Sequence, residues 1–152
     1  MHPDELARRC ARALWDKDVA SQAMGMRLQE VAAGRATLAM RVRDDMANGH
    51  GLCHGGHIAT LADSAFAIAC NTYDEVTVAA GFDITFVAPA RPGDLLVATA
   101  AERVRHGRSG LYDVTVRTAD DTVIAEFRGR SRRLGRPILT PAEGERNVPC
   151  ET

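Results

Sequence analysis

This chain lacks an apolar run long enough to cross a bilayer, because its most apolar stretch is interrupted by Asp63, Ser64 and Asn71. Its first residues, MHPDELARR, lack the apolar core of a signal peptide. The cysteines show no CxxC spacing and are scattered, at Cys10, Cys53, Cys70 and Cys150. We therefore expect reduced thiols, a cytoplasmic location and no association with a membrane.

The chain also lacks a strong charge of either sign, since its formal net charge is −1. No global basic field exists to hold a nucleic-acid backbone, so we expect no nucleic-acid partner. Apolar residues make up 45% of the 152 residues and charged residues 26%, a balance typical of a globular protein. The length predicts one domain, residues 1–136, followed by a poorly ordered tail, residues 137–152, that contains further prolines.

The order of predicted elements favours one architecture. Residues 4–17 have the spacing of a short amphipathic helix, and residues 56–71 that of a long, mostly apolar one. Turn signals at regular intervals predict strands at residues 24–32, 36–43, 76–88, 94–105, 111–118 and 122–134. A single long helix needs cover, and a curved antiparallel sheet wrapped around it would supply that cover. The sequence thus predicts an α+β protein with the hotdog fold.

The predicted long helix has two apolar faces. One stripe should pack on the sheet, and it comprises Ile58, Leu61, Ala62, Ala65, Phe66 and Ala69. The other face carries the small residues Ala59, Ala67 and Cys70, with Asp63 among them. Small side chains allow close approach of another backbone, and we interpret this face as the contact with a second subunit.

An acid in such a helix requires an explanation. Asp63 could cap a loop, pair with an arginine or remain solvated at an edge. Burial of an unpaired carboxylate is costly, however, and perturbed acids beside polar loops are enriched at functional sites. We therefore favour a catalytic role for Asp63.

The opposite end of the helix carries Gly55 and Gly56. Their amides lie at the positive end of the helix dipole and suit an oxygen that gains negative charge, although the glycines could instead serve only a tight turn. Asp63 follows Gly55 by eight residues, which corresponds to about 12 Å along the axis. If both act on one carbonyl, the acid must come from an antiparallel helix of a second subunit, which predicts a two-fold dimer with shared active sites.

The sequence is similar to the hotdog-fold acyl-CoA thioesterases, in particular to the phenylacetate-pathway branch, which hydrolyses hydroxylated phenylacetyl-CoA thioesters. The similarity extends from the first helix to about residue 135. Its motifs are residues 48–56 (NGHGLCHGG), 61–71 (LADSAFAIACN), 83–89 (DITFVAP), 107–113 (GRSGLYD) and 127–131 (FRGRS).

The resemblance implies a role for each matching residue. Asp63 is the nucleophile or the general base, Asn48 helps to position the water or the carboxylate, the Gly55 amide polarises the carbonyl, and His54 supports the loop. Some relatives add a serine or threonine on the strand after the helix. Here residues 78–81 (VAAG) contain none, although Thr77 is close.

The resemblance also implies an acyl-CoA substrate, no cofactor, and homo-oligomers, usually tetramers that pair two dimers. CoA phosphates need cationic contacts, and arginine suits phosphate geometry. Among the arginines of the last strands we select Arg108, Arg132 and Arg133 as CoA-binding residues, together with the Gly56 amide.

Other kinds of site are disfavoured. The histidines His50, His54 and His57 lack the spacing of a metal site, so we expect no metal. A Cys53–His54 pair is disfavoured because catalytic pairs are normally assembled from distant positions. The alternatives to hydrolysis are a non-hydrolytic acyl-CoA-binding protein and an enoyl-CoA hydratase, although the motif expected of a hydratase is absent.

Overall fold

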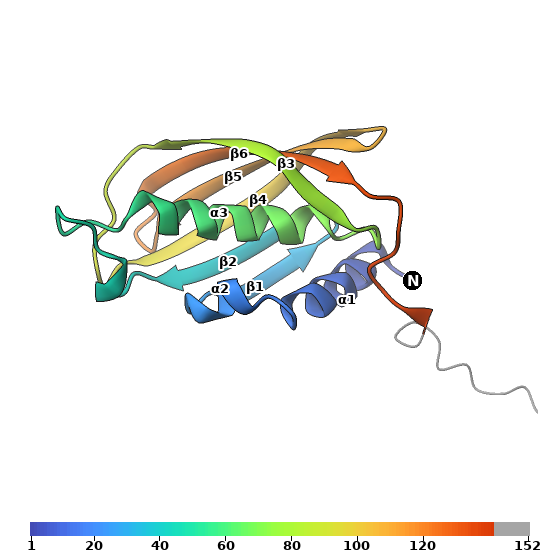
Figure 1. Cartoon of the computed structure of the whole chain (residues 1–152), viewed down its shortest axis with the longest axis horizontal. Helices are drawn as coiled ribbons and strands as arrows, with labels where there is room; N and C mark the ends of the chain where they lie inside the picture. The colour runs from blue at the N-terminus through green and yellow to red at the C-terminus, as the bar shows by residue number, and fades with distance from the viewer. Residues whose placement is uncertain (142–152) are drawn as a thin grey trace, which may run out of the picture.

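The computed structural model describes residues 1–141, in which a curved six-stranded sheet lies around one central helix (Figure 1). The elements in chain order are α1 (Pro3–Trp15), α2 (Val19–Ala23), β1 (Arg27–Ala32), β2 (Arg35–Arg41), the 3-10 helix η1 (Asp44–Met46), α3 (Gly55–Cys70), β3 (Thr77–Phe86), β4 (Leu95–His106), β5 (Ser109–Thr118) and β6 (Val123–Arg133). Every strand pairing is antiparallel, and the strand order is β1-β2-β4-β5-β6-β3. The predicted hotdog fold is confirmed.

Helix α3 lies along the concave side of the sheet and forms the centre of the core (Figure 1). All six residues of the predicted sheet-facing stripe are at most 3% exposed, which confirms the interpretation of that stripe. Ala59, Asp63 and Ala67 on the second face are only half-buried. Cys70, the last member of that face, is buried within the chain beside Asn71.

Asn71 connects the end of α3 to the start of β3. Its side-chain amide donates to the carbonyls of Ala67 and Thr77, both at 2.8 Å, and its side-chain oxygen accepts from the Thr77 amide at 2.9 Å. The Asn71 side chain is buried, so these bonds satisfy backbone groups that water cannot reach. They hold the start of β3 beside the second, half-buried face of α3.

The segment before β1 differs from the prediction. A strand was expected from residue 24, but Asp18 caps the short helix α2, and Met24 is the residue that ends it. Gly25 then turns the chain with a φ of +74°, so β1 begins at Arg27. The second strand likewise ends at Arg41 instead of residue 43. The missed signal was Asp18 itself, because aspartate is one of the residues preferred at a helix N-cap.

Strand β3 is an edge of the sheet, since it pairs with β6 on one side only. It exposes several large apolar side chains, including Phe82 at 39% and Phe86 at 50%. An open edge with exposed apolar residues is a surface that favours pairing with another chain.

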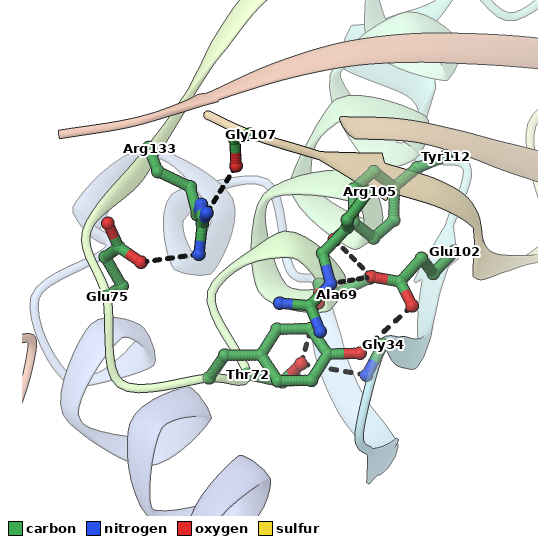
Figure 2. A network of polar contacts seen from close by, with 10 residues as sticks. Gly34, Ala69, Thr72, Glu75, Glu102, Arg105, Gly107, Tyr112 and Arg133 are labelled. Atoms are coloured by element: carbon green, nitrogen blue, oxygen red, sulfur yellow. Dashed lines mark hydrogen bonds and ion pairs between the residues drawn. The ribbon is translucent and has the colours of Figure 1, made fainter. Parts of the chain in front are cut away.

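A partly buried polar cluster lies beside the C-terminal end of α3 (Figure 2). The Glu102 carboxylate accepts hydrogen bonds from Tyr73 and Tyr112, both at 3.1 Å, and forms an ion pair with Arg105 at 2.6 Å. The Tyr112 ring is 1% exposed. Glu102 is therefore the acceptor on which a buried hydroxyl depends.

We expect Glu102→Ala to lower the free energy of unfolding by about 1–3 kcal/mol, because the buried Tyr112 hydroxyl would lose its acceptor. Urea denaturation at a fixed protein concentration measures this loss. The control is Tyr73→Phe, which removes one donor and strands no buried group, so its loss should be smaller. Equal stability of Glu102→Ala and wild type would contradict this role of Glu102.

The expected tail falls largely on residues 142–152, which lie outside the described part of the chain. Within the described first residues of that tail, the amides of Ile138 and Leu139 donate to the Asp74 carboxylate at 3.1 and 2.8 Å. No helix within residues 1–141 is long and apolar enough to span a membrane.

Candidate active site

The N-terminus of α3 presents a free amide. His54 precedes the helix, and its Nδ1 accepts a hydrogen bond from the Gly56 amide at 3.0 Å. The Gly55 amide has no hydrogen-bond acceptor among residues 1–141. The Phe86 ring covers Gly55 so closely that a Cβ there would lie 2.9 Å from it. Gly55 therefore offers a helix-terminal donor beside an aromatic wall, whereas the Gly56 donor is already occupied by His54.

Asn48 shapes the loop that leads into α3. Its side-chain oxygen accepts from the backbone amides of His50 and Leu52, at 2.9 and 3.2 Å. Its backbone N–H donates to the Leu52 carbonyl at 2.7 Å. The side-chain NH₂ of Asn48 has no partner within the described residues, so it can donate to a ligand. We call residues 48–56 the donor end.

Asp63 lies farther along α3, beside a cavity of about 540 Å³. The apolar part of its lining includes Leu14, Phe66, Val76 and Ile138. The Asp63 carboxylate has no hydrogen bond or ion pair with any described residue. We call this space the Asp63 cavity. In this cavity the unpaired Asp63 carboxylate faces apolar side chains of α1, α3 and β3.

Burial raises the pKa of the Asp63 carboxyl, and the nearby charge of Asp18 raises it further. The folded state thus disfavours the ionised form of Asp63 more than the unfolded state does. Such a group costs little stability below its unfolded pKa, and the cost grows as the pH rises through the raised pKa of the folded state.

We expect Asp63→Asn to be more stable than wild type at pH 7, with the difference shrinking as the pH falls toward about 4, near the ordinary pKa of aspartate. Urea midpoints at both pH values and one protein concentration measure this. The control is Asp121→Asn, which removes an exposed carboxylate paired with Arg117 and should give no such gain. A less stable Asp63→Asn protein at pH 7 would contradict the prediction.

The donor end and Asp63 do not meet within one chain. Eight residues of helix separate Gly55 from Asp63, about 12 Å of axial rise. The structure therefore groups Asn48, His54, Gly55 and Gly56 at one end of α3 and leaves Asp63 apart. A second, antiparallel copy of α3 would bring a carboxylate to each donor end.

The selected arginines lie beyond the other end of α3. The β4–β5 turn, which contains Arg108, lies toward the C-terminal end of the helix (Figure 1). Arg108 and Arg132 are exposed, and neither pairs with any described residue. Arg133 instead binds Glu75 at 2.9 Å and donates to the Gly107 carbonyl (Figure 2). Arg108 and Arg132 are thus available for an anion, whereas Arg133 already holds the turn.

Sequence reasoning missed a buried contact between α2 and the residue that follows Asp63. The hydroxyl oxygens of Ser21 and Ser64 lie 2.7 Å apart, and Ser21 also donates to Asp18 at 2.6 Å. Helix α2 was not predicted, so no signal placed Asp18 near Asp63. Cys53 and Cys70 are buried, as small thiol side chains usually are. Within residues 1–141, no three histidine, cysteine or acidic side chains gather in a group that could hold a metal ion.

Comparison with known proteins shows the family to which the chain is similar. The model of the thioesterase superfamily matches residues 50–125. The acyl-coenzyme A thioesterase PaaI of Escherichia coli is 38% identical over 132 residues, which cover 87% of this chain and 94% of that protein. A solved structure of the E. coli PaaI protein, from the phenylacetic acid degradation operon, superposes with a TM-score of 0.87 at 36% identity and covers 88% of this chain and 97% of that one.

A second solved structure, of a point mutant of the phenylacetic acid degradation protein PaaI from Thermus thermophilus, has a TM-score of 0.74 and 35% identity. It covers 77% of this chain and 100% of that one. The matched family segment contains the start of α3, Asp63 and strands β3 to β5. The chain therefore belongs to the thioesterase superfamily, and within it to the PaaI-like acyl-CoA thioesterases of the hotdog fold.

Proposed function

We propose that this enzyme hydrolyses aryl-acetyl-CoA thioesters, such as phenylacetyl-CoA and its hydroxylated forms, to the free acid and CoA, at sites shared between two subunits. The observation that carries the proposal is a pair of groups on α3 without partners among the described residues, the Gly55 amide and the Asp63 carboxylate. One group suits the carbonyl oxygen of a thioester, and the other suits attack on its carbon.

The reaction requires both groups at one carbonyl. Asp63 either adds directly to the carbon or removes a proton from a water that adds there. The carbonyl oxygen then becomes an oxyanion, which the Gly55 amide stabilises. The C–S bond breaks as the oxyanion collapses, the CoA thiolate departs and takes up a proton, and, on the direct route, water hydrolyses the acyl-aspartate. Asn48 can orient the attacking group through its side-chain NH₂.

The pairing of two subunits is supported by the open edge of β3. If two β3 strands pair antiparallel about a two-fold axis, the two α3 helices also run antiparallel across it. The C-terminal end of one α3 then approaches the donor end of the other, and Arg108 and Arg132 approach with it. Two dimers pairing into a tetramer would leave these sites intact.

The aryl-acetyl preference rests on two supports. The E. coli and Thermus relatives are named for phenylacetic acid degradation. The Asp63 cavity is lined largely by apolar side chains, among them Leu14, Phe66, Val76 and Ile138. A phenyl ring that leaves water for such a cavity gains about 1.5–3 kcal/mol of binding free energy.

We therefore expect kcat/KM for phenylacetyl-CoA to exceed that for acetyl-CoA by about ten- to a hundredfold, the equivalent of burying the ring. Release of the CoA thiol, followed with a thiol reagent, measures both rates. A preference for acetyl-CoA would contradict the aryl assignment. If the enzyme binds these esters without releasing thiol, or hydrates crotonyl-CoA instead, the hydrolytic proposal is wrong.

A further inference from the structure

A second carboxylate, Asp18, lines the same cavity as Asp63. Asp18 belongs to the connection between α1 and α2 and caps the start of α2. The motifs that identify the family begin at residue 48 and do not include it. Asp18 and Asp63 therefore face the same cavity, and Asp18 does not touch the donor end.

Asp18 is held in a fixed position. Its Oδ1 accepts from the Ser21 amide at 2.9 Å, and its Oδ2 accepts from the Ser21 hydroxyl at 2.6 Å. Because that hydroxyl has a single proton, Ser64 must supply the proton of the 2.7 Å Ser21–Ser64 contact. Ser21 and Ser64 are 2% and 8% exposed. A buried chain of hydrogen bonds therefore connects Asp18 to the residue that follows Asp63.

The other groups that face Asp63 do not cancel this charge. Lys17, in the connection between α1 and α2, lines the cavity, but its side chain is exposed to water, which screens its charge. On α3, burial raises the pKa of the Cys70 thiol to about 12, so it stays neutral at pH 7. The cavity-lining residues of β3 and of the segment after β6 carry no charge. Asp18 is therefore the fixed like charge beside the acid.

We propose that Asp18 is a positioning residue for thioester hydrolysis, a second carboxylate whose negative charge sets the pH range over which Asp63 acts. This inference rests on the proposed role of Asp63. A like charge disfavours ionisation of its neighbour, which makes the ionised neighbour a stronger base. The enzyme gains reactivity near neutral pH and loses activity earlier as the pH falls.

The test is the pH dependence of kcat/KM for phenylacetyl-CoA in wild type and Asp18→Asn. Asparagine is as good a helix cap as aspartate, so α2 should form in the variant. We expect the acidic limb of the profile to move to lower pH by about half a unit to one unit. High salt should reduce the difference between the two proteins. The matched control is Asp16→Asn, which removes an exposed charge two residues away and should leave the limb in place.

An acidic limb that stays in place in Asp18→Asn would overturn the proposal. Asp18→Ser, a second neutral cap, repeats the measurement if the asparagine variant does not fold. The Asp63 carboxyl can also be titrated directly by carbon-13 NMR, with its signal assigned by its loss in Asp63→Asn. Its pKa should fall in Asp18→Asn. This titration tests the inference even if the wild type hydrolyses none of the thioesters, a result that would refute only the proposed function.

Discussion

Asp63→Asn should hydrolyse phenylacetyl-CoA about a thousandfold more slowly than wild type, in the middle of the 10²–10⁴ range that a positioned general base contributes. The amide has nearly the shape of the carboxylate but can neither accept a proton from water nor attack as an anion. The loss should appear in kcat, because the side chain acts on the reacting carbon and does not hold the CoA nucleotide. Steady-state kinetics of thiol release measure this effect.

Two features make this result interpretable. The asparagine variant is expected to be at least as stable as wild type at pH 7, so loss of activity cannot be ascribed to unfolding. Asp121→Asn in the β5–β6 turn provides the matched control, since Asp121 is exposed and pairs with Arg117 away from β3 and α3. Its activity should stay close to that of wild type. Activity of Asp63→Asn within tenfold of wild type would remove Asp63 from the chemistry and leave the fold unaffected.

Gly55→Pro should lower kcat by about 10²–10³, the usual effect of removing one donor from an oxyanion hole. Proline lacks the amide proton but suits the first position of a helix. His54 already has the extended backbone, with φ −59° and ψ 132°, that a residue before proline requires. The substitution therefore deletes the proposed donor and retains the helix start.

The matched control for this variant is Gly55→Ala. Both substitutions place a Cβ about 2.9 Å from the Phe86 ring, but alanine keeps the amide proton. The ratio of the two activities therefore separates loss of the donor from the Cβ contact that both variants share. Equal activities of the proline and alanine enzymes would mean that the Gly55 amide does not polarise the carbonyl.

The sequence predicted the centre of the fold well because its signals are local. The apolar stripe of α3 repeats with helical spacing, and turn residues separate the strands of the sheet. Helix α2 was missed because five residues give too little periodicity, and only the Asp18 cap marks its start. Its omission shifted the predicted start of the first strand by three residues.

The site could be predicted only in part. Asp63 is recognisable as an acid in an apolar helix, and its place beside a cavity agrees with that interpretation. The hydrogen bond from the Gly56 amide to His54 depends on a side-chain rotamer, which no sequence pattern encodes. The contact of Ser21 with Ser64 spans 43 residues, so only the folded chain shows it. The hydrogen bond from Arg133 to Glu75 spans 58 residues and is likewise seen only in the folded chain.

Mixing two inactive proteins tests the central claim, that each site takes its donor end from one chain and its acid from another. Asp63→Asn and Gly55→Pro chains are unfolded together in equal amounts and refolded. In each mixed dimer one shared site carries both substitutions and the other carries neither. With half the dimers mixed, activity should return to about one quarter of wild type. If each site lies within one chain, the mixture stays as inactive as its components, and that result would contradict the shared-site account.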